Sequence, residues 1–136
     1  MSNHLEGKNT HTLPNFTPDI PIFTKLYDFY KILSHTIISF PKTKRYTLGQ
    51  KLDNLTLEIF ELLFAFPLSV NKAETLQRIS VKVDLLKILL RLAKDNQSLT
   101  EKKYLELQSI LQEIGKMLGG WIKFTKQNLP LKESSY

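Results

Sequence analysis

Three cations and one aromatic ring lie within five consecutive residues of the segment 40–50, the connector between two long stretches of helical periodicity. These residues are Lys42, Lys44, Arg45 and Tyr46. Ammonium and guanidinium groups contact phosphate, and a tyrosine ring can stack on a base, so the combination favours nucleic-acid binding over catalysis. We expect Pro41 to end the preceding helix, and Thr47 with Gln50 has the spacing of a capping box that starts the next one.

Further cations fall on the third helical segment. Arg78 and Lys82 are four residues apart, and the other side of the same helix carries Lys87, Arg91 and Lys94. The arginines are the stronger candidates, because a guanidinium can bind phosphate through two parallel hydrogen bonds. Together with the connector they predict a surface that binds nucleic acid, RNA or DNA, through its phosphates. The alternative, an ordinary solvated face of lysines, stays open.

The residues that catalysis or metal binding would need are missing or isolated. The chain has no cysteine, which removes disulfides, thiolate nucleophiles and zinc–cysteine sites. Two of the three histidines lie in the polar N-terminal stretch and His35 stands alone, so neither a triad nor a Glu-x-x-His metal motif is formed. Gly115, Gly119 and Gly120 lack the Lys-Ser or Lys-Thr of a phosphate loop and are expected to serve close helix packing. We therefore predict a protein that is not an enzyme and uses no cofactor or metal.

Length and composition are those of one folded unit with polar ends. The 136 residues are 42% hydrophobic and 24% charged, which suffices for a single core. Lysine and arginine number 19 against 13 acidic residues, and the net charge of +6 favours anionic partners. No apolar run has the length of a membrane span, and the N-terminus lacks the apolar core of a signal peptide, so a cytoplasmic location is expected. We expect polar tails over residues 1–17 and 128–136 and a folded domain over 18–127.

Four stretches of helical periodicity divide this domain. They cover about 18–40, 48–66, 71–95 and 98–127. Asp19, Asn71 with Glu74, and Ser98 with Glu101 are expected to start the first, third and fourth helices. Helices of about twenty residues joined by short turns predict an all-α, antiparallel up-down-up-down four-helix bundle.

The two middle helices carry more apolar residues than one core-facing stripe requires. On the third helix, a second apolar stripe lies on a face roughly opposite the first. The surplus residues of the two helices are Leu57, Phe60, Phe64, Val81, Leu85, Ile88, Leu89 and Leu92. An isolated bundle would leave them in water, so they predict an interface between copies of the chain. The alternative is that central helices bury a wider arc.

The order of residues in the connector carries a resemblance to a known family. The segment 40–49 reads Phe-Pro-Lys-x-x-Arg-Tyr-Thr-Leu-Gly, and a Gly-Gly-Trp follows at 119–121. Over about residues 20–124 the chain resembles the four-helix-bundle proteins that include the accessory variability determinant (Avd) of diversity-generating retroelements and the 23S rRNA intervening-sequence proteins.

That resemblance implies an assembly and a set of partners. Members of the family form homopentameric barrels, and the retroelement protein works with a reverse transcriptase and its template RNA in mutagenic retrohoming. Carried onto this chain, the resemblance implies contacts with RNA, the polymerase or both at Lys42, Lys44, Arg45, Arg78, Lys82 and Arg91. The alternative within the family is an intervening-sequence-type protein that acts as a protein-interaction scaffold.

Overall fold

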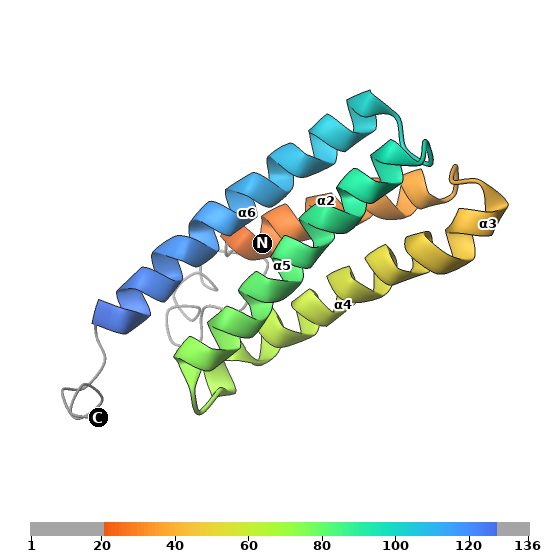
Figure 1. Cartoon of the computed structure of the whole chain (residues 1–136). Helices are drawn as coiled ribbons and strands as arrows, with labels where there is room; N and C mark the ends of the chain where they lie inside the picture. Colours follow the sequence, from red (N-terminus) through yellow and green to blue (C-terminus); the bar gives the residue numbers. More distant parts are fainter. Residues whose placement is uncertain (1–20, 128–136) are drawn as a thin grey trace, which may run out of the picture.

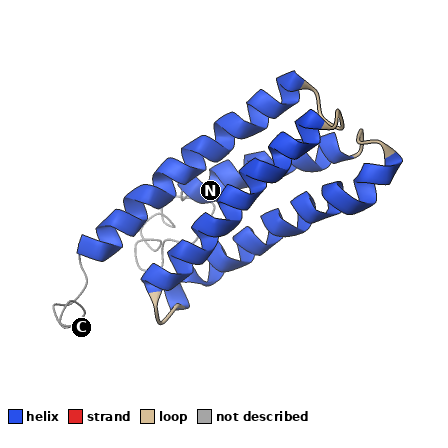
Figure 2. Ribbon diagram, viewed as in Figure 1, coloured by secondary structure: helices blue, strands red, loops and turns tan. Residues whose placement is uncertain are grey.

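Four long helices build the molecule, as seen in a computed structural model that describes residues 21–127 (Figure 1). They are α2 (Pro21–Ile37), α4 (Gln50–Ala65), α5 (Lys72–Asp95) and α6 (Glu101–Gln127). Two short elements precede α4, namely α3 (Lys42–Lys44) and the π-helix η2 (Arg45–Gly49), and the 3-10 turn η3 (Phe66–Leu68) joins α4 to α5. In this part of the chain all regular structure is helical (Figure 2).

The long helices pack in the antiparallel arrangement that the periodicity predicts. Helix α2 contacts α4 and α6, and α5 contacts the same two helices, so the four close into a bundle. The connector and the turn between α5 and α6 therefore lie at one end of the bundle, and η3 lies at the other (Figure 1). The all-α four-helix fold is confirmed.

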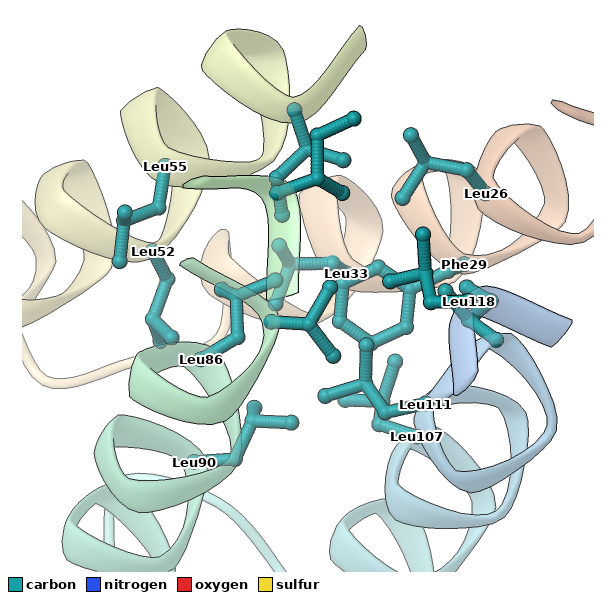
Figure 3. Close-up of a cluster of buried hydrophobic side chains, with 14 of the residues drawn as sticks. Leu26, Phe29, Leu33, Leu52, Leu55, Leu86, Leu90, Leu107, Leu111 and Leu118 are labelled. Carbon is teal, nitrogen blue, oxygen red and sulfur yellow. The ribbon is translucent and has the colours of Figure 1, made fainter. Parts of the chain in front are cut away.

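One apolar core runs along the inside of the bundle. Leucines and Phe29 from all four helices point toward one another there (Figure 3). The core stripe predicted on the third helix is fully buried, and its members are Ile79, Val83, Leu86, Leu90 and Ala93. Side chains at spacings of three and four residues meet on one face of a helix, which explains why this pattern could be identified from the sequence.

The capping residues test the predicted helix boundaries. The Asn71 side chain accepts a hydrogen bond from the Glu74 amide at 3.0 Å, so the start of α5 is confirmed. The start of α6 is not where it was expected, because Thr100 accepts from the Lys103 amide at 3.1 Å. Ser98 instead donates its hydroxyl and its amide to the side chain of Asn96, within the turn.

The connector is helical from Lys42 onward, which corrects the predicted capping box. Pro41 precedes the first turn with a φ of −56°, and its carbonyl accepts the amides of residues 44 and 45 at 2.8 and 2.9 Å. The Thr47 hydroxyl donates to the carbonyls of residues 43 and 44, as it does in the interior of a helix, and caps nothing. Proline is well suited to the N-terminus of a helix, and its effect here is to start one as well as to end another.

Gly49 is required by the close approach of α2 to the π-helix. It is buried, and a Cβ atom at this position would lie 2.9 Å from the Ile37 methyl group. At Gly119 and Gly120, by contrast, a Cβ would meet no atom within 4 Å, and at Gly115 it would meet only the flexible end of Lys87 at 3.3 Å. The predicted role of these late glycines in close helix packing within the bundle is therefore wrong.

The predicted tails, 1–17 and 128–136, and the Asp19 cap lie outside the described residues. Among residues 21–127, no helix combines the length and apolar composition needed to cross a membrane.

Candidate nucleic-acid interface

The two connector lysines extend from the tip of the bundle. Both Lys42 and Lys44 are exposed, and within residues 21–127 neither ammonium has an ion-pair partner. Tyr46 follows them, with 63% of its surface exposed. A cation without a carboxylate neighbour keeps its full charge for a ligand, so these residues are the clearest candidates for phosphate contacts.

Arg45 occupies a different position from its lysine neighbours. It is half-buried, and its Nη2 donates to the Phe40 carbonyl at 3.3 Å. The guanidinium lies 6.0 Å from the centre of the Tyr46 ring, within range of a cation–π interaction. Its Nε atom is buried and donates to no acceptor in the described residues. This side chain therefore packs against the connector itself, although it was predicted with the lysines as a nucleic-acid contact.

Three lysines of α5 face carboxylates. The Lys82 ammonium lies 3.0 Å from Glu58 of α4, and Lys87 lies 3.9 Å from Asp84. Lys94 is 4.0 Å from Asp95 and 3.8 Å from Glu101, and it also lies over the Tyr104 ring. These ion pairs lower the local positive potential, so the three residues are weaker candidates for phosphate contacts than the connector lysines.

The arginines of α5 are exposed and unpaired but lie far apart. Arg78 and Arg91 have no ion pair or hydrogen bond within the described part of the chain. Thirteen residues of helix separate them by roughly 20 Å. Arg91 lies toward the connector end of the bundle and Arg78 toward the η3 end (Figure 1). The predicted cations therefore form two groups, of which only one adjoins the connector.

A polar groove of about 730 Å³ opens at the connector end, between the end of α2 and the turn after α5. Its lining includes His35, Ser39, Lys94, Ser98, Thr100 and Lys103. His35, Ser39 and Lys103 were not singled out from the sequence. In an antiparallel bundle the end of the first helix and the start of the fourth are adjacent, so the polar residues at both ends were the available signal.

The surplus apolar residues of α5 form a continuous exposed row. Its members are Val81, Leu85, Ile88 and Leu92, which lie opposite the buried stripe, and Val81 is 64% exposed. Leu89 lies at the edge of the row and is partly buried against the core. Large aliphatic side chains in a row on one helix are typical of a surface that binds another protein.

The surplus residues of α4 belong to a second surface. Phe60 is half-buried and packs against Phe23 and Tyr30 of α2, with ring centres 5.6 and 6.2 Å away. Leu57 and Phe64 share its helical face, and Phe64 is 68% exposed. This face is turned toward α2, whereas Glu58 reaches α5. The eight residues predicted as one interface therefore lie on two separate surfaces.

The described residues offer no evident catalytic or metal site. In this part of the chain, no three His, Asp or Glu side chains are grouped so that they could hold a metal ion. A hydrogen bond to Asp53 raises the pKa of Tyr30 above its ordinary value, with smaller effects of burial and of the Asp53 charge. That pair links α2 to α4 beside the Phe60 contacts.

These features define a class: an antiparallel four-helix bundle with free cations at one end and an exposed aliphatic row along one helix. The model of the bAvd-like family matches residues 22–125, so the chain belongs to this family of bacterial Avd proteins. The comparisons with curated proteins and with solved structures found no match. Of the two branches in the resemblance, the family match names the Avd branch.

Proposed function

We propose that this protein is a non-catalytic accessory factor that binds nucleic acid and assists the reverse transcriptase of a diversity-generating retroelement, together with its template RNA, in mutagenic retrohoming. Membership of the bAvd-like family supports an Avd-type accessory role. The observation that carries the nucleic-acid part is the pair of unpartnered lysines, Lys42 and Lys44, at the tip of the connector.

Binding proceeds mainly through phosphates. Lysine side chains at the surface neutralise phosphate charge and release counterions, and such contacts carry little sequence information. Arg91 and the polar groove lie at the same end of the bundle as the connector and extend the surface available to the polyanion. Any RNA or DNA with an accessible backbone satisfies these contacts.

The protein acts as a homo-oligomer, for which the family resemblance suggests a pentamer. The exposed row of α5, centred on Leu85 and Ile88, supplies one contact surface. The face of α4 and α2 around Phe64 supplies a second and different one, as a ring with head-to-tail contacts requires. A closed ring would bring several connectors together, and multivalent binding would then raise the affinity for a long polyanion.

Titration of a labelled RNA with the purified protein at several salt concentrations tests nucleic-acid binding. We expect the logarithm of the affinity to fall linearly with the logarithm of the salt concentration. Failure to bind RNA at low ionic strength contradicts this part of the proposal.

Co-purification with the reverse transcriptase encoded beside the gene tests the accessory role. We expect the tagged protein to retain the polymerase, and a variant with acidic residues in the α5 row to lose it together with the oligomer. A protein that binds RNA but never retains the polymerase is a nucleic-acid-binding protein without the retroelement role.

A further inference from the structure

Tyr46 is the exposed aromatic ring nearest to the free lysines. It follows Lys44 by two residues, within the π-helix that begins at Arg45. A π-helix is rare and is found frequently at functional sites, where it changes the direction of the side chains that follow. With 63% of its surface exposed, the ring has room for a flat ligand.

The connector holds the ring in place. Arg45 lies 6.0 Å from the ring centre, and its hydrogen bond to the Phe40 carbonyl ties it to the backbone. Gly49 packs directly against Ile37, which fixes the far end of the π-helix against α2. An aromatic side chain that is ordered before binding loses little conformational entropy when a ligand stacks on it.

We propose that Tyr46 stacks on an unpaired base of a single-stranded nucleic acid while Lys42 and Lys44 contact the flanking phosphates. This inference rests on the proposed function and adds the class of ligand. Bases in a duplex are already stacked and paired, whereas single strands present free base faces to aromatic side chains. The cation of Arg45 beside the ring supports the same stack.

Tyr27 provides a matched control within the same bundle. Its ring is 57% exposed, and the Lys31 ammonium lies 5.2 Å from its centre. Lys31 is also 3.8 Å from Asp28, so the cation beside this ring has a carboxylate neighbour. Tyr27 therefore matches Tyr46 in exposure and in its nearby cation but lacks the free lysines of the connector.

The experiment measures the affinity for a single-stranded oligonucleotide and for a duplex of equal length at several salt concentrations. We expect Tyr46→Ala and Tyr46→Leu to weaken single-strand binding by about 5- to 100-fold, the usual effect of losing one stacked base. Duplex binding and the salt dependence should stay unchanged. Tyr46→Phe should bind as the wild type does, and so should Tyr27→Ala.

Two results overturn the stack and are distinct from failure of the proposed function. If Tyr46→Leu binds the single strand as Tyr27→Ala does, or if both Tyr46 variants weaken duplex and single strand equally, no base stacks on this ring. Phosphate binding by the wild type would then still stand. If the wild type binds neither oligonucleotide at low salt, the proposed function fails and the stack fails with it. Circular dichroism of each variant checks that the bundle has folded.

Discussion

The connector and the outer face of α5 are both rich in cations, but their cations have different surroundings. Lys42 and Lys44 lie at the tip of the bundle, where no carboxylate of the described residues pairs with them. On α5, Lys82 lies 3.0 Å from Glu58, and Lys87 and Lys94 also lie near carboxylates. Equal numbers of positive residues therefore produce unequal fields.

The difference assigns different partners to the two regions. A free cation at a tip attracts phosphate, whereas paired cations beside a row of aliphatic side chains are typical of the rim of a protein interface. We infer that the connector binds the polyanion and that the α5 row, centred on Leu85 and Ile88, binds protein. Each prediction below changes one region and leaves the other intact.

The largest expected effect is loss of the oligomer when charge enters the α5 row. In Leu85→Asp/Ile88→Asp, association would bury two unpaired carboxylates, at a cost of about several kcal/mol for each. Light scattering should then show the mass of a single chain. Leu105→Asp, at an exposed leucine of α6 outside both surfaces, should retain the wild-type mass. A double variant with the wild-type mass removes this row from the interface.

Neutralising the connector should weaken nucleic-acid binding without changing the assembly. We expect Lys42→Gln/Lys44→Gln to lower RNA affinity by roughly tenfold or more and to reduce the salt slope by about 2, because each lost phosphate contact contributes about 0.9. Lys82→Gln/Lys87→Gln removes the same charge from α5 and should have a smaller effect. Equal effects of the two double variants would show that ion pairing does not distinguish the regions.

A methyl group at Gly49 should destabilise the fold, because it would lie 2.9 Å from the Ile37 methyl group. We expect Gly49→Ala to lower the free energy of unfolding by about 1–3 kcal/mol. Gly119→Ala is the matched control. It meets no atom within 4 Å and should stabilise α6 by roughly 0.5–1 kcal/mol. Denaturant unfolding measures both, and an unchanged stability of Gly49→Ala would contradict the close approach.

The smallest expected effect comes from releasing Lys82. In Glu58→Gln the ammonium loses its partner at 3.0 Å and becomes a free cation like those of the connector. We expect RNA affinity at low salt to rise a few-fold, and stability to change by less than about 1 kcal/mol, because the pair is partly exposed. A decrease in RNA affinity would mean that Glu58 itself contributes to the binding surface.

Sequence periodicity predicted the fold because the core spacing is local. Ile79, Val83 and Leu86 recur at helical intervals, and the bundle buries all three. The boundaries were harder to predict where two signals competed. Thr47 has the spacing of a cap, but Pro41 had already started the helix five residues earlier along the chain.

The candidate site was only partly accessible to sequence reasoning. Residue types identified the connector, whereas the pairing of Lys82 with Glu58 joins residues 24 positions apart and depends on the packing of α5 against α4. The division of the apolar surplus has the same origin, since Phe60 meets α2 and not α5. Contacts between helices decide which charges are free, and a single helical wheel does not contain them.

The most direct test of this account is photo-crosslinking of the purified protein to RNA, followed by mass spectrometry of the nucleotide-bearing peptides. We predict adducts on peptides that contain residues 40–50 and none on those that contain 81–92. Adducts concentrated on 81–92, with the connector unmodified, would contradict the assignment of the polyanion to the connector and of protein contacts to α5.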